Sequence, residues 1–173
     1  MKRLLLLRHA KSARPAGVLD HERPLERRGF EDSRVMGAYL RQEMLLPDLV
    51  LVSTSNRTRQ TWDVVIQGLG GVPSASFEPR LYDAPAARLA KVIGETAQTV
   101  RSLMLIGHNP GLHELAVALA DENSPTFRAL ASGKFPTAAC VSFRVPADWS
   151  ALGSSRHELI GYVAPDSLAD EDP

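Results

Sequence analysis

Two kinds of segment alternate along this chain. Short, unbroken apolar runs at residues 4–7, 49–52 and 103–106 are typical of strands that are buried on both faces of a sheet. Between these runs, longer segments carry apolar residues at helical spacing, as Phe30, Met36, Leu40 and Met44 do in the first of them. Strands that alternate with helices predict a layered α/β domain with a largely parallel sheet.

The same pattern places the remaining elements. Helices are predicted at about residues 26–44, 56–67 and 86–96 and in a segment that begins at Pro110, and Gly68, Gly70 and Gly71 should end the second helix. Further strands are predicted at 138–145 and 158–163, with Phe77 in a short extended piece. Residues 11–24 are predicted to be a loop, and residues 121–134 to be irregular or partly helical. We expect one domain over residues 1–165 and a disordered acidic tail over residues 166–173.

Composition narrows the function classes. Twenty basic and twenty acidic residues cancel, so net charge gives no support for a nucleic-acid partner or a membrane surface. Cys140 is the only cysteine, which excludes an intramolecular disulfide and fits a reducing compartment. The apolar stretch after Arg3 is too short for a secretion signal. We therefore expect a cytoplasmic protein with neither nucleic-acid nor membrane partners.

Chemistry is predicted where three strands end. The first strand runs into Arg8 and His9, the second is followed by Ser53 and then Arg57, and the third ends at His108. In parallel sheets, ligands bind at the carboxyl ends of strands. Arginine offers a planar fork that matches phosphate oxygens, and a neutral imidazole can attack phosphorus. Nearby guanidinium groups would keep an imidazole neutral at pH 7. The strand ends therefore predict an anion pocket.

Other chemistries lack their sequence signals. No glycine-rich phosphate loop of the Walker or dinucleotide type is present, and Cys140 has no evident base. The histidines lie too far apart in the sequence for a recognisable metal motif; they are His9, His21, His108, His113 and His157. We expect no metal and no cofactor.

Three motifs in order resemble those of a known family. Arg8-His9-Ala10 is similar to the Arg-His-Gly/Ala signature of the histidine phosphatase superfamily, which includes the cofactor-dependent phosphoglycerate mutases. The spacing Ser53-x-x-x-Arg57-x-x-x-Thr61 resembles its second motif, and Gly107-His108-Asn109-Pro110-Gly111 its third. The small size and three further segments resemble the SixA-type phosphohistidine phosphatases; these segments are Arg23-Pro24-Leu25, Leu81-Tyr82-Asp83-Ala84 and Phe135-Pro136-Thr137-Ala138. The resemblance spans residues 3 to about 145 and implies a three-layer α/β/α sandwich of the phosphoglycerate mutase-like type.

The resemblance also implies roles for residues. His9 would accept the phosphoryl group, Arg8 and Arg57 would bind it, and His108 would donate a further hydrogen bond. Lys11, Ser12 and Asn109 are expected to contact the substrate. Asp83 is the nearest candidate for a general acid, with Glu78 the weaker one. This weak acid signal favours a phosphorus–nitrogen bond as the target, because imidazole leaves more readily than an alkoxide.

The preferred interpretation is a metal-independent phosphatase that acts on phosphohistidine in a protein such as a histidine phosphotransfer domain. A phosphatase of small phosphate esters with the same mechanism is one alternative. A phosphoprotein-binding module without turnover is the other, although the presence of both histidines and both arginines argues against it. Among the other polar residues, we expect Arg59 in solvent and His21, His113 and His157 at the surface. Arg23 is expected in a salt bridge with Asp20, with an auxiliary role in phosphate binding as the alternative. Trp62 is expected in the core.

Overall fold

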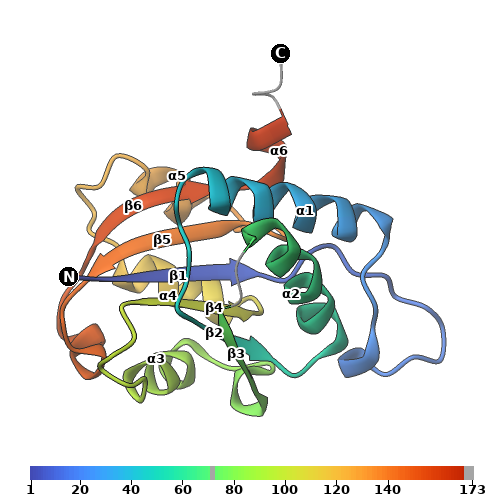
Figure 1. Cartoon of the computed structure of the whole chain (residues 1–173), viewed down its shortest axis with the longest axis horizontal. Coiled ribbons are helices and arrows are strands. Elements are labelled where there is room, and N and C mark those ends of the chain that lie inside the picture. Colours follow the sequence, from blue (N-terminus) through green and yellow to red (C-terminus); the bar gives the residue numbers. More distant parts are fainter. Residues whose placement is uncertain (71–72, 170–173) are drawn as a thin grey trace.

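A mixed sheet forms the centre of the computed structural model, which describes residues 1–70 and 73–169 (Figure 1). Within these residues the strand order is β3-β2-β4-β1-β5-β6. Neighbouring strands from β3 to β1 run parallel, whereas β5 is antiparallel to β1 and β6 is antiparallel to β5. The strands are β1 (Lys2–Arg8), β2 (Leu49–Ser53), β3 (Ser74–Glu78), β4 (Ser102–Gly107), β5 (Cys140–Val145) and β6 (Glu158–Val163). The predicted largely parallel sheet is confirmed.

Helices cover both faces of this sheet, which confirms the three-layer sandwich (Figure 1). Helices α1 (Arg27–Gln42) and α2 (Asn56–Leu69) pack on one face, and α3 (Ala86–Gly94) and α4 (Gly111–Leu119) pack on the other. Two shorter helices, α5 (Phe127–Ser132) and α6 (Pro165–Ala169), follow later in the chain. The 3-10 turns are η1 (Asp20–Glu22), η2 (Pro79–Leu81) and η3 (Trp149–Ser154).

Strand β1 shows why the apolar runs are continuous. Leu4 and Leu6 join the core under α3 and α4, whereas Leu5 and Leu7 join the core under α1 and α2. All four side chains are fully buried. Burying a leucine contributes about 1.5–3 kcal/mol relative to leaving it exposed. A strand between two helical layers therefore requires apolar residues at every position.

The end of the chain corrects one expectation. Residues 166–169, predicted to belong to a disordered tail, lie in α6, where Asp166 Oδ1 accepts a hydrogen bond of 2.9 Å from Arg28 Nη2 on α1. The ion pair and the packing of Leu168 against the core on the α1 side explain the order. Residues 170–173 of the predicted tail, and Gly71, lie outside the described residues. None of the described helices is both long and apolar enough to cross a membrane.

Candidate active site

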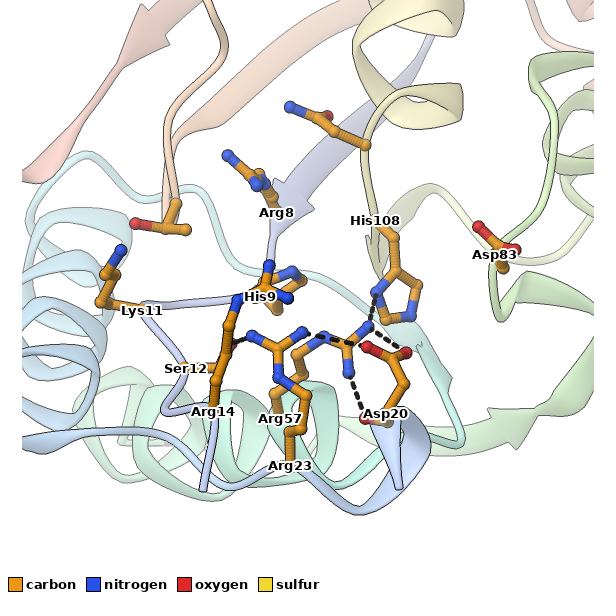
Figure 2. A pocket seen from close by; sticks show the side chains of 12 residues that line it. Arg8, His9, Lys11, Ser12, Arg14, Asp20, Arg23, Arg57, Asp83 and His108 are labelled. Carbon is orange, nitrogen blue, oxygen red and sulfur yellow. Dashed lines mark hydrogen bonds and ion pairs between the residues drawn. The ribbon is translucent and has the colours of Figure 1, made fainter. Parts of the chain in front are cut away.

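A cavity of about 220 Å³ opens at the carboxyl ends of β1, β2 and β4 (Figure 2). The structure brings together here eight residues that the sequence nominated, and only the weaker acid candidate Glu78 lies elsewhere: Arg8, His9, Lys11, Ser12, Arg57, Asp83, His108 and Asn109. Four further residues line the cavity, of which the sequence suggested only Arg23, as an auxiliary phosphate ligand: Arg14, Asp20, Arg23 and Thr137. The order β2-β4-β1 makes these strands neighbours, which explains why segments far apart in the sequence meet.

His9 is oriented by the residue that follows it. Its Nδ1 lies 2.8 Å from the main-chain oxygen of Ala10. A carbonyl oxygen only accepts, so Nδ1 carries the proton and Nε2 keeps its lone pair. Burial, followed by the charges of His108, Arg57 and Arg8, lowers the pKa of His9 to about 3, although the hydrogen bond to Ala10 raises it in part. His9 is therefore neutral at pH 7, with Nε2 available as a nucleophile.

His108 is held between β2 and α2. Its Nε2 lies 2.7 Å from Ser53 Oγ, and its Nδ1 lies 3.4 Å from Arg57 Nη2. Because a guanidinium only donates, Nδ1 accepts and the Nε2 proton points to Ser53. Burial, followed by the charge of Arg57, lowers the pKa of His108 to about 3. The rings of His9 and His108 lie 5.3 Å apart between centroids, so both face one small volume.

The two arginines are anchored in the same way. Arg8 Nη1 donates to the main-chain oxygen of Phe135 at 3.2 Å, and Arg57 Nη1 donates to that of Asp20 at 2.8 Å. The Nε group of each arginine is buried and has no hydrogen-bond partner among the described residues. A buried donor without a partner is costly, so these groups are suited to bind the oxygens of an anion.

The second motif links three parts of the site, which explains its spacing. Ser53 contacts His108, and Arg57 reaches the cavity from the first turn of α2. Thr61, one turn later, accepts a hydrogen bond of 3.0 Å from the main-chain nitrogen of Ala10, the residue after His9. Residues four apart on a helix share a face, so Arg57 and Thr61 act on the same side. Ser55 caps the helix, because its side chain accepts a hydrogen bond from the main-chain nitrogen of Thr58.

Asp20 is the main feature that sequence reasoning missed. Its predicted salt bridge with Arg23 is confirmed at 3.0 Å, but the pair lies at the cavity, and Asp20 also contacts Arg57 at 3.2 Å (Figure 2). The surrounding loop has no periodic pattern, so its sequence gave no indication of which side chains face inward. The Arg23-Pro24-Leu25 segment, singled out in the resemblance, was the nearest available signal.

Three residues near the cavity, Arg59, Glu78 and Trp62, do not line it. Arg59 lies over the ring of Phe77 at 4.1 Å and does not line the cavity. Glu78 forms an ion pair with Arg80 and does not line the cavity. Trp62 is buried in the core, as predicted.

The expectation of a surface position for His157 was wrong. Its side chain is buried, and its Nε2 lies 2.6 Å from the main-chain oxygen of Leu152. A histidine with a main-chain partner can be buried without a net polar penalty. His113 is only partly exposed and contacts the main-chain oxygen of Leu130 at 2.7 Å.

The cavity is rich in cationic side chains and poor in metal ligands. Over residues 1–70 and 73–169, no group of three or more histidine, cysteine or acidic side chains is arranged to hold a metal ion. Five arginine or lysine residues line the cavity against two carboxylates: Arg8, Lys11, Arg14, Arg23 and Arg57 against Asp20 and Asp83. The arrangement can bind an anion of phosphoryl size beside a neutral imidazole.

Known proteins resemble the chain over nearly its whole length. No family model matches it. An uncharacterized protein of Mycobacterium tuberculosis is 36% identical over 162 residues, which cover 92% of this chain and 99% of that protein. A solved structure from Agrobacterium tumefaciens, assigned as phosphohistidine phosphatase SixA, has a TM-score of 0.80 and 30% identity over 95% of this chain and 98% of its own. The protein histidine phosphatase SixA complexed with tungstate has a TM-score of 0.72 and 26% identity, with coverage of 96% and 99%.

Proposed function

The chain belongs to the histidine phosphatase superfamily, in which its neighbours are SixA-type phosphatases, and on that basis we propose that it hydrolyses phosphohistidine on a protein through a covalent intermediate at His9. The observation that carries the proposal is the neutral, oriented imidazole of His9 beside two arginines whose buried Nε groups have no partner among the described residues.

The reaction divides into two displacements. Nε2 of neutral His9 attacks phosphorus as the bond from phosphorus to the substrate imidazole breaks. The substrate ring, protonated on its other nitrogen, leaves as neutral imidazole with the bonding electron pair, and the phosphorylated ring of His9 keeps its Nδ1 proton hydrogen-bonded to the Ala10 oxygen. Water then attacks the phosphorus on His9 and releases inorganic phosphate, which regenerates the neutral ring. Arg8 and Arg57 stabilise the charge on the transferred group in both steps, because phosphoryl transfer depends mostly on positioning and charge.

His108 changes its hydrogen bonds when a phosphoryl group binds. In the present arrangement its Nδ1 accepts from Arg57. A phosphoryl oxygen is also an acceptor, so Nδ1 must then carry the proton. Ser53 can accommodate this, because a hydroxyl group accepts from Nε2–H in one tautomer and donates to Nε2 in the other.

The state of Asp20 favours a phosphorus–nitrogen substrate. The hydroxyl of Tyr82, followed by Arg23 and Arg57, lowers the pKa of Asp20 well below its usual range against the effect of burial, so this carboxylate is ionised and holds no proton to donate. Asp83 lines the cavity and stays the candidate for a general acid. A leaving imidazole depends less on such an acid than an alkoxide does.

We propose that no metal takes part. The two arginines supply the positive charge that a metal ion would otherwise provide, and the described residues offer no ligand cluster. The tungstate bound to the SixA neighbour mimics phosphate, so tungstate should also bind in this cavity. The cytoplasmic location expected from the sequence stays a prediction.

A substrate panel tests the proposal. Purified protein is assayed with a phosphorylated histidine phosphotransfer domain, phosphoramidate and unactivated alkyl phosphates, with His9→Ala as the inactive control. We expect release of phosphate from the first two and little from the alkyl esters. Efficient turnover of alkyl esters would favour the small-ester alternative. Binding of the phosphoprotein without any phosphate release would favour the binding module.

A further inference from the structure

The loop before α1 carries a carboxylate that the proposed chemistry does not use. Asp20, on η1, contacts three side chains at the edge of the cavity, and Figure 2 shows two of them, Arg23 and Arg57. Its Oδ1 accepts from Arg23 Nη1 at 3.0 Å, and its Oδ2 accepts from Arg57 Nη2 at 3.2 Å and from the hydroxyl of Tyr82. Its main-chain oxygen accepts from Arg57 Nη1 at 2.8 Å.

The geometry of the guanidinium decides what Asp20 does to Arg57. A guanidinium can hold two oxygens along its Nη1/Nη2 edge or along its Nε/Nη2 edge. Asp20 occupies the first edge with its main-chain oxygen and Oδ2. The Nε–H is buried without a partner among the described residues, and Nη2 also faces Nδ1 of His108. The second edge therefore faces His108 and holds no oxygen acceptor among the described residues.

Tyr82 holds the carboxylate in this position. Its hydroxyl donates to Oδ2, and its ring packs edge-on against His108 at 5.5 Å between centroids, with the Arg57 guanidinium 6.0 Å from the ring. The segment that carries Tyr82 packs closely against the start of α4. A Cβ atom added to Gly111 would lie only 2.0 Å from the main-chain oxygen of Ala84, so there is no space for a side chain between them. Tyr82 thus contacts Asp20, Arg57 and His108 together.

On the basis of the proposed function, we infer that Asp20 is a positioning residue, clamped by Tyr82, that fixes the Nη1/Nη2 edge of Arg57 and thereby turns the Nε/Nη2 edge toward the transferred phosphoryl group. The opposite role is a competitor that occupies Arg57 until phosphate displaces it. The two roles predict opposite effects of removing the carboxylate on anion affinity.

Calorimetric titration with tungstate separates the two roles, because it needs no turnover. Asp20→Ala should weaken tungstate binding by about tenfold, which corresponds to about 1.4 kcal/mol, since Arg57 regains rotamer freedom that binding must then remove. Asp20→Asn keeps an acceptor oxygen and should restore most of the affinity. Glu22→Ala removes the same charge from the same 3-10 turn, where Glu22 pairs with His21, and should not weaken binding.

Two further variants, Tyr82→Phe and the double variant with Asp20→Ala, keep the inference testable if Asp20→Ala does not fold. Tyr82→Phe retains the ring and loses only the hydroxyl, so it should weaken tungstate binding in the same direction as Asp20→Ala, and the double variant should be less than additive. Thermal melting checks that each variant is folded.

The results distinguish this inference from the proposed function. Tungstate binding to Asp20→Ala that equals or exceeds that of the wild type would overturn the positioning role and establish a competitor. Failure of the wild-type protein to bind tungstate at all would contradict the anion pocket and the proposed function itself.

Discussion

Replacement of Arg57 by alanine is expected to lower kcat/KM by an amount that can be worked out from the structure. The side chain of Arg57 is only 8% exposed, so solvent screens its interactions weakly. The Nε and Nη2 groups can give a phosphoryl group two charge-assisted hydrogen bonds, each contributing about 1.5–3 kcal/mol. Their sum, about 3–6 kcal/mol, corresponds to a loss of roughly 10²- to 10⁴-fold in kcat/KM for Arg57→Ala. The assay is steady-state hydrolysis of phosphoramidate at low ionic strength.

Arg59 provides the matched control for that experiment. It lies two residues further along the same helix and over the ring of Phe77, away from the cavity, so Arg59→Ala should leave kcat/KM nearly unchanged. Arg57→Lys should recover only part of the loss, because an ammonium group cannot form the two-pronged contact. A larger effect of Arg59→Ala than of Arg57→Ala would refute the assignment of the motif.

Three further outcomes are expected. His9 and His108 have a pKa of about 3 in the folded protein, against about 6.5 in the unfolded chain. Because the unfolded chain binds these protons first, the free energy of unfolding is highest above pH 6.5 and falls as the pH drops toward 3. The slope is up to about 1.4 kcal/mol per pH unit for each ring. Urea denaturation should show a shallower pH dependence for His9→Gln, and an unchanged one would contradict this. Phosphoramidate hydrolysis should survive dialysis against EDTA, whereas loss that a divalent metal restores would exclude the metal-independent mechanism. Asp83→Asn should barely change phosphoramidate hydrolysis. If the wild type hydrolyses alkyl phosphates well and Asp83→Asn slows that hydrolysis a hundredfold, Asp83 is the general acid and the small-ester alternative replaces the phosphohistidine assignment.

Apolar runs and helical spacing were sufficient to predict most of the sandwich. Helix α2, expected at 56–67, spans Asn56–Leu69, and Gly70 ends it in the left-handed conformation that favours glycine. Gly68, also expected to end it, lies within the helix. It packs against Gly37 of α1 so closely that a Cβ atom on Gly68 would meet the main chain of Gly37 at 2.7 Å. Such a close helix contact depends on the tertiary arrangement and leaves no mark in local periodicity.

The same distinction applies to the site. Arg8, His9 and His108 could be predicted because buried strands end at them, and the strand order then brings those ends together. Asp20 could not be predicted, since it lies in a loop and its partners Arg57 and Tyr82 are distant in the sequence. A loop side chain acquires its role from where the chain folds back, which residue spacing does not encode.

Identification of the phosphorylated residue tests the central claim most directly. The protein is mixed with labelled phosphoramidate, quenched within the first turnover in alkaline detergent, because phosphohistidine is labile in acid, and digested for mass spectrometry. The account predicts phosphate on His9 in the wild type, and neither label nor turnover in His9→Ala. Label on another residue, or undiminished turnover by His9→Ala, would contradict it.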